Sequence, residues 1–338
     1  MTRIRVGYSA LAPVLWLVAC DGVVAPEPLL LIQPVAGEPN VDIFYGAYVD
    51  VHNTGSVGDY QCGAKTFNAH TGTDILIRNF EVMDSGVTVL AAAPGVVATA
   101  RDGQFDRNTA FAPASAGNHV TIEHENNYST LYAHLKNGSV RVQPGETVSA
   151  GTPIGQIGSS GSSNWHHLHF EVRANGKPVE PANGPCNGLS LWANQLPYQN
   201  AFMVTDAGLL TGTAFSLAAL LEAPATRDTV GLNSDSLLFW LQTLNHKSET
   251  MRFELIDPSD SITFQISGSE NASFALRYLG LPFQVPDGPA GAWQIRMLIN
   301  GVVHRQQTFE LVVPPSTRQP AGWPSGTRFA PSTDSANR

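Results

Sequence analysis

The stretch of the sequence with the clearest chemical potential is residues 161–172, where small polar residues lead into the alternating run His-Leu-His-Phe-Glu-Val. The alternation predicts a short β-strand, in which side chains two positions apart share a face. His167 and His169 would then point to one side, and Leu168 and Phe170 into a core. Two adjacent imidazoles can serve a metal and a substrate, but a single His-x-His also occurs in ordinary half-exposed strands. The choice between these readings depends on whether the chain supplies further ligands.

A second polar motif, His70-Thr-Gly-Thr-Asp74, places an imidazole and a carboxylate four residues apart. Gly72 favours a loop that enters a strand at residues 75–77 over a helix. Imidazole and carboxylate are good zinc ligands, and one more imidazole would give three protein ligands with an open fourth position. A water molecule at such a position becomes acidic near neutral pH and can act as a nucleophile. His134 is a further imidazole that could act as a base or stabilise an oxyanion.

In this order and spacing, the motifs resemble those of the lysostaphin/LytM-type zinc endopeptidases, which cut peptidoglycan cross-bridges. The resemblance covers about residues 60–182, roughly half of the chain. It is carried by His70-x-x-x-Asp74, Tyr132-Ala-His134-Leu, His167-Leu-His169-Phe-Glu-Val and the text of residues 93–98, 117–124 and 142–155.

The resemblance implies a role for each of the polar motif residues. His70, Asp74 and His169 would bind one zinc ion per chain, and His134 and His167 would be the catalytic imidazoles. One of these two imidazoles would take a proton from the attacking water, and the other would stabilise the oxyanion before a proton passes to the leaving amine. No Glu base of the His-Glu-x-x-His kind is present or required.

The sequence departs from the family pattern just before the His-x-His strand. The family usually has Gly-Pro there, whereas this chain has Trp165-His166. In a regular strand His166 faces away from His167, so it is expected to be structural or to line the rim. Trp165, His166 and Asn68 are candidate substrate contacts. Glu171 shares the face of His169 and could support it, although an ordinary solvated Glu is the more usual finding.

The first 19 residues have the parts of a secretory signal: Arg3 and Arg5, an apolar run over residues 6–18, and Leu17-Val-Ala-Cys20, which matches a bacterial lipobox. We expect Cys20 to be lipidated and to tether the protein to a membrane. A plain cleaved signal with a chance cysteine is the alternative. The predicted localisation is therefore the bacterial cell envelope, on the periplasmic or extracellular side.

Two further cysteines, Cys62 and Cys186, bracket the region with the candidate chemistry. Export implies an oxidising compartment, so we predict a disulfide between them. The alternative is a pair of free thiols.

The composition fits an all-β, water-soluble chain: Gly 31 and Pro 23 among 338 residues make turns frequent, and no long helical periodicity occurs. A net charge of −9 without a basic run gives no support for nucleic-acid binding. We expect a tether at 20–40, a LytM-type (duplicated hybrid motif) zinc endopeptidase domain at 41–200 and an immunoglobulin-like β-sandwich at 205–313. Residues 314–338 should form a disordered tail.

The predicted function is hydrolysis of stem peptides or cross-bridges of peptidoglycan by a zinc-activated water. One alternative is a non-catalytic relative that activates another wall hydrolase; such relatives typically lack zinc ligands, whereas all five motif positions are present here. Another is a zinc peptidase that acts on a protein. The predicted sandwich could bind a protein partner or wall glycan, or act as a spacer, because fold alone does not give function.

Overall fold

The computed structural model describes residues 29–52, 55–111, 115–211, 216–222, 226–231, 236–269, 276–284, 287–312 and 330–331. The predicted signal peptide, the lipidation site Cys20 and the tail apart from residues 330–331 lie outside this range. No helix within the described ranges is long and apolar enough to cross a membrane.

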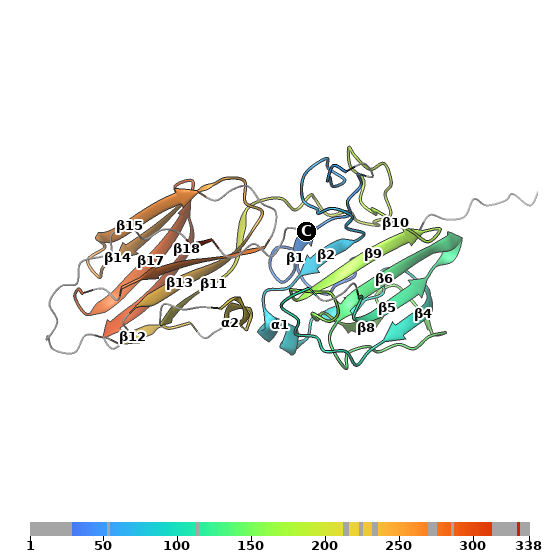
Figure 1. The fold of residues 1–338 in the computed structure, drawn as a ribbon, viewed down its shortest axis with the longest axis horizontal. Helices are drawn as coiled ribbons and strands as arrows, with labels where there is room; N and C mark the ends of the chain where they lie inside the picture. Colours follow the sequence, from blue (N-terminus) through green and yellow to red (C-terminus); the bar gives the residue numbers. More distant parts are fainter. Residues whose placement is uncertain are drawn as a thin grey trace, which may run out of the picture.

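The first half of the described chain builds an eight-stranded sheet with the order β1-β2-β9-β6-β5-β4-β7, and β10 pairs with β9 (Figure 1). All neighbours in it run antiparallel. Its strands are β1 (Phe44–Ala47), β2 (Thr73–Leu76), β4 (Gly95–Arg101), β5 (Asn118–Glu123), β6 (Tyr128–Leu135), β7 (Thr147–Val148), β9 (His167–Ala174) and β10 (Lys177–Val179).

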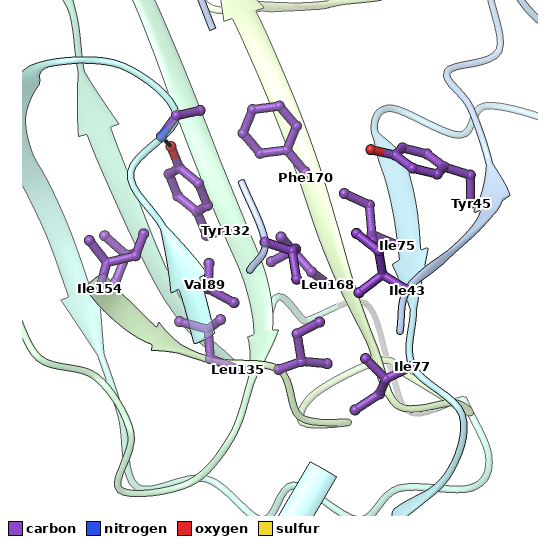
Figure 2. Packing of buried hydrophobic residues seen from close by; sticks show 14 of the residues in the cluster. Ile43, Tyr45, Ile75, Ile77, Val89, Tyr132, Leu135, Ile154, Leu168 and Phe170 are labelled. Atoms are coloured by element: carbon purple, nitrogen blue, oxygen red, sulfur yellow. Dashed lines mark hydrogen bonds between the residues drawn. The ribbon is translucent and has the colours of Figure 1, made fainter. Parts of the chain in front are cut away.

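One face of this sheet is covered by a buried apolar layer (Figure 2). Leu168 and Phe170 of β9 contribute to it together with Ile75 of β2, as the alternation along each strand predicts. The two-stranded sheet of β3 (Thr88–Leu90) and β8 (Pro153–Gln156) supplies Val89 and Ile154. The polar residues of β2 and β9 are therefore left on the opposite face.

Helical structure is limited to short pieces, so the all-β prediction is confirmed. Helix α1 (Phe80–Ser85) follows β2, with Asn79 as the N-cap that accepts a hydrogen bond from the Val82 N–H. Helix α2 (Leu217–Leu221) and the 3₁₀ turn η1 (Glu125–Asn127) are single turns.

The second half forms a four-stranded sheet, β11-β13-β16-β19, and a five-stranded sheet, β12-β18-β17-β14-β15. We refer to these two as the C-terminal sheets. Their apolar side chains share one buried cluster, which includes Phe239 of β13 and Phe253 of β14. The strands are β11 (Met203–Thr211), β12 (Thr229–Gly231), β13 (Leu237–Leu244), β14 (Thr250–Ile256), β15 (Ile262–Ser269), β16 (Arg277–Phe283), β17 (Gly291–Ile299), β18 (Val302–Val312) and β19 (Ala330–Pro331).

The predicted tether at residues 20–40 is wrong for its described part. Leu31 and Val35 are buried in the core of the eight-stranded sheet. The Leu31 N–H donates to Leu191 O at 2.7 Å and the Ile32 N–H to Ala92 O at 2.8 Å. A free tether would leave these apolar side chains in water, whereas here their burial removes them from it.

The predicted disordered tail is wrong at Ala330–Pro331. These residues form β19, which pairs antiparallel with β16 in the register Leu279↔Pro331 and Gly280↔Ala330. The exposed edge of β16 gives this short segment backbone partners, which composition alone does not reveal.

Candidate active site

The polar face of strands β2 and β9 brings the two sequence motifs together. The strands pair antiparallel with Asp74 opposite His169 and Leu76 opposite His167. Cross-strand neighbours lie about 5 Å apart and share a face. This register therefore places the carboxylate between the two strand histidines.

Three of the expected ligand atoms meet at one point. Asp74 Oδ1 lies 2.9 Å from His169 Nδ1 and 3.1 Å from His70 Nε2, and the two ring nitrogens are 3.3 Å apart. Within the described ranges, these residues form a group whose ligand atoms all lie within 4.8 Å of one another. Two imidazoles and a carboxylate form a donor set that suits zinc.

His70 reaches this point from a tight turn. Ala69 has a φ of 60° and its N–H donates to Asp50 Oδ2 at 3.0 Å, which fixes the turn. The His70 Nδ1–H donates to the Tyr48 carbonyl at 2.7 Å. A carbonyl can only accept, so Nδ1 carries the proton and Nε2 keeps its lone pair for a metal.

Gly72 is required between His70 and Asp74 by close approach. A Cβ at this position would lie 2.7 Å from both His169 Nε2 and the Phe170 carbonyl. Any larger residue would push β2 away from β9 and spread the ligand atoms.

Glu171 supports His169 from behind, which corrects the expectation of an ordinary solvated side chain. It is only 3% exposed, and its Oε2 lies 3.4 Å from His169 Nε2. The Thr71 hydroxyl donates to the same oxygen at 2.6 Å and Arg173 Nε donates to Oε1 at 2.5 Å. These contacts orient the ring so that Nδ1 faces Asp74.

The charges of the site favour a bound cation. Burial disfavours the ionised Asp74 carboxyl, but the neighbouring His70, His167 and His169 hold its pKa well below the usual range. Burial also disfavours a charged His169, yet Asp74 and Glu171 raise its pKa to about 9. Two carboxylates around one imidazole thus create a negative environment suited to a metal ion.

His134 and His167 stand beside the three ligand residues. Their ring centroids are 4.8 Å apart, and His134 is 5.9 Å from His169. His134 is the last residue but one of β6 and has a φ of 64°, and its Nδ1–H donates to the Ser160 carbonyl at 2.8 Å. Burial, together with the charges of the neighbouring histidines, lowers its pKa well below the usual value, so the ring is neutral.

His167 is held in the same tautomer. Its Nδ1–H donates to the Trp165 carbonyl at 2.9 Å, and its Nε2 lies 3.7 Å from Asp74 Oδ1. Burial lowers its pKa despite the opposing effect of Asp74. Both rings therefore present a lone pair on Nε2 and can accept a proton.

The three candidate substrate contacts differ in their exposure. His166 is fully buried, with its ring edge-on to Phe80 at 5.1 Å, which agrees with the structural role expected for it and not with a place on the rim. Trp165 is half-buried and stacks on Tyr278 of β16. Asn68 is exposed in the turn before His70. Phe67, which the sequence reading missed, stacks on the His70 ring at 4.2 Å.

Cys62 and Cys186 are joined in a disulfide with a Cα–Cα distance of 5.3 Å. Asp59 organises the loop of Cys62 by accepting hydrogen bonds from the N–H groups of Gln61, Gly63 and Lys65. The bridge ties this loop, which leads to His70, to the segment after β10.

Comparison with known proteins agrees with this geometry. Residues 68–181 match the model of Peptidase family M23. The matched range contains both motifs and His134.

Curated relatives match over the same part of the chain. The DD-carboxypeptidase/endopeptidase Mpg of Neisseria meningitidis is 38% identical over 119 residues, 35% of this chain and 23% of that protein. The peptidoglycan DD-endopeptidase ShyA of Vibrio cholerae is 36% identical over 110 residues, 32% and 21% respectively. The chain thus spans less than a quarter of the length of these relatives.

Solved structures with a likeness to the chain include the catalytic domain of lysostaphin from Staphylococcus simulans, with 22% identity and a TM-score of 0.27 over 42% of this chain and 90% of that one. A zinc-containing peptidase from Vibrio cholerae has 26% identity and a TM-score of 0.28 over 47% and 39%.

Proposed function

We propose that this chain, whose residues 68–181 match the model of Peptidase family M23, is a zinc-dependent endopeptidase that hydrolyses peptide cross-bridges or stem peptides of peptidoglycan. The observation that carries the proposal is the convergence of His70, Asp74 and His169 beside two neutral imidazoles. The relatives named as peptidoglycan DD-endopeptidases support the substrate class.

The donor set fits one zinc ion held by His70 Nε2, Asp74 and His169 Nδ1. Each imidazole uses its other nitrogen for a fixed partner, the Tyr48 carbonyl and the Glu171 carboxylate. When bound, zinc supplies a water of lowered pKa and polarises the scissile carbonyl. Three protein ligands leave a coordination position open for this chemistry.

His134 and His167 are the groups that accept and donate protons in the proposed reaction. One Nε2 accepts the proton of the attacking water, and the Nε2–H formed in this way can hydrogen-bond the developing oxyanion. The C–N bond then breaks, and the accepted proton passes to the leaving amine. The Ser160 and Trp165 carbonyls hold both rings in the orientation that this exchange requires.

The alternative of a non-catalytic activator is disfavoured because the complete ligand and imidazole set is present. A zinc peptidase that acts on a protein is the second alternative, and a substrate panel separates it from the proposal. Purified peptidoglycan should release soluble peptides with the wild type, and the Gly-rich protein elastin should be cut much more slowly. Preference for elastin would contradict the proposed substrate class.

The experiment that tests the reaction compares three samples on purified peptidoglycan: wild type, His134→Ala and wild type with a chelator. We expect fragment release only from the wild type, and recovery of the chelated sample when zinc is restored. Release by His134→Ala at the wild-type rate would contradict the mechanism.

We also propose that the protein is an envelope lipoprotein anchored to a membrane through Cys20. The lipobox at residues 17–20 supports this. Labelling of cells with an alkyne fatty acid should mark the wild type but not Cys20→Ser; equal labelling of both would refute the anchor.

A further inference from the structure

The C-terminal sheets rest on the sheet face that carries the candidate site. Leu76 lies directly opposite His167 on the neighbouring strand and shares the face of Asp74. An apolar cluster joins this position to the C-terminal sheets: Phe44, Leu76 and Leu244, with Met203 and Leu276 packed against them. Figure 1 shows this second body lying against the end of the sheet where α1 and β2 meet.

An aromatic contact links the C-terminal sheets to the turn before the His-x-His strand. The rings of Trp165 and Tyr278 stack with an interplanar angle of 13° and centroids 6.1 Å apart. This is within the range of favourable offset stacking. Tyr278 is 1% exposed and also packs on Trp240, so its ring has no room to move away.

The turn that Tyr278 contacts carries the acceptor for His167. The Trp165 carbonyl receives the Nδ1–H of His167 at 2.9 Å. Neither Trp165 nor His166 restricts its backbone dihedrals as a proline would. The Ser163 hydroxyl donates to the same carbonyl at 2.6 Å, and the side chains that pack on the turn fix the residue that carries it.

Gln242 of β13, the strand that pairs with β16, provides a second link, to the backbone after β2. Gln242 Nε2 donates to the Tyr278 hydroxyl at 2.5 Å and to the Arg78 carbonyl at 2.9 Å. The Ile77 N–H in turn donates to the His166 carbonyl at 3.2 Å. Tyr278 thus belongs to a network that holds both sides of the turn.

Phe80 makes a second contact to the turn, through His166, and Arg107 covers the Phe80 ring. The Arg107 guanidinium pairs with Asp84 at 2.8 Å and with Glu222, which follows α2. It lies 4.6 Å over the Phe80 ring, whose edge-on contact holds His166. The two residues of the turn are therefore each held by an aromatic ring: His166 contacts Phe80, and Trp165 contacts Tyr278.

We propose that Tyr278 is a positioning residue: by stacking on Trp165 it fixes the carbonyl that orients His167, so the C-terminal sheets are a working part of the active site. This inference rests on the proposed function, since it assigns His167 a proton-transfer role. It differs from a role as spacer or as partner-binding module.

The test combines steady-state kinetics on a soluble peptidoglycan peptide with amide hydrogen exchange of the metal-free protein. Tyr278→Ala should lower kcat about 10- to 100-fold with KM unchanged, because a small misplacement of a reacting group has that effect. The exchange of amides in residues 158–168 should rise. Trp165→Ala should reproduce both changes, and the double variant should be no worse than either single one.

Two control variants separate positioning from loss of stability. Tyr278→Phe keeps the stacked ring, and Gln242 keeps its hydrogen bond to the Arg78 carbonyl without the hydroxyl. This variant should therefore have the kcat and the slow amide exchange of the wild type. Phe309→Leu alters a residue that is 1% exposed in the core of the C-terminal sheets and does not touch Trp165. It should lower the melting temperature but leave kcat and the exchange of residues 158–168 as in the wild type.

Unchanged exchange and kcat in Tyr278→Ala would overturn the inference. A rise of KM in Trp165→Ala with no effect in Tyr278→Ala would also overturn it, because Trp165 would then contact substrate directly. A wild type that binds no zinc and cuts no peptide would refute the proposed function, and the exchange result alone would decide whether Tyr278 holds the turn. If Tyr278→Ala does not fold, Tyr278→Leu and the half-buried Trp165→Ala give the same comparison.

Discussion

Asp74 Oδ1 lies 2.9 Å from His169 Nδ1 because their strands pair with these two residues directly opposite each other. The same carboxylate oxygen is 3.1 Å from His70 Nε2. Asp74 thus connects the motif at residues 70–74 with the His-x-His strand, and its removal should change the surroundings of both His70 and His169.

Asp74→Ala should lose zinc. The variant removes the only carboxylate among the three ligands, and two imidazoles alone hold the ion weakly. Metal analysis after dialysis should find about one zinc per wild-type chain and almost none in the variant. His134→Ala serves as the matched control and should keep its zinc; retention of metal by Asp74→Ala would remove this carboxylate from the site.

His167→Ala should keep its zinc but lose activity about 10²- to 10⁴-fold, the usual range for a general acid–base group. Its ring contributes a neutral Nε2 beside the ligands rather than a ligand atom. Zinc content and peptide hydrolysis measured on the same preparation check this. Loss of metal in His167→Ala would instead make it a ligand.

Glu171→Gln should weaken zinc binding about 10- to 100-fold, as changes to a partner of a metal-bound histidine do. The pKa of this buried carboxyl is about 2, since its hydrogen bonds from His169, Thr71 and Arg173 outweigh burial. Competition with a chromophoric chelator gives the affinity. The exposed Glu123 on β5 offers the control Glu123→Gln, which should bind as the wild type; equal affinities of both variants would refute the role of Glu171.

His166→Leu should make folding stability less sensitive to acid. Burial lowers the pKa of His166 to about 4 from 6.5. The unfolded chain therefore binds a proton that the folded chain rejects as the pH falls from about 6.5 to 4. Folding stability is lost over this window, by about 3 kcal/mol for this one group at full protonation.

Urea unfolding at pH 7 and pH 4.5 measures this effect. The free energy of unfolding should fall less in His166→Leu than in the wild type between these pH values. The other buried histidines remain in both proteins and cancel in the comparison. Parallel losses in the two proteins would contradict the assignment of a neutral buried His166.

Reduction of the Cys62–Cys186 disulfide should destabilise the protein. The bridge closes a loop with a sequence separation of 124 residues, for which chain entropy gives about 4–5 kcal/mol. Cys62→Ser/Cys186→Ser should unfold at lower urea concentration than the wild type, and reductant should shift only the wild type. An unchanged midpoint would show that the bridge is absent or without effect.

The sequence contained most of what places the ligands. Alternation along residues 167–172 correctly predicts which side chains of β9 face the core, because the period of a strand is two. The loop-then-strand reading of His70 to Asp74 matches the observed course of the chain into β2. The burial of Glu171 could not be read from its position, because it depends on Thr71 and Arg173.

Contacts between the two halves of the chain could not be predicted from the sequence. Nothing in the local pattern around Trp165 or Tyr278 indicates that their rings meet, since the pairing depends on how separate sheets dock. The apolar Leu31 looked like part of a lead-in for the same reason: its partner Leu191 lies far along the chain. Side-chain chemistry and strand period are local properties of the sequence, whereas the way in which distant segments pack against one another is not.

The most direct measurement of the central claim is the chemistry of the ends released from purified peptidoglycan. Treatment with the zinc-loaded protein should generate new free amines, matched by pairs of fragments whose masses together exceed that of the intact peptide by one water, and no new reducing sugars. Chelation or His167→Ala should abolish both signals. New reducing ends without new amines, or no released fragments from the zinc-loaded wild type, would contradict the account.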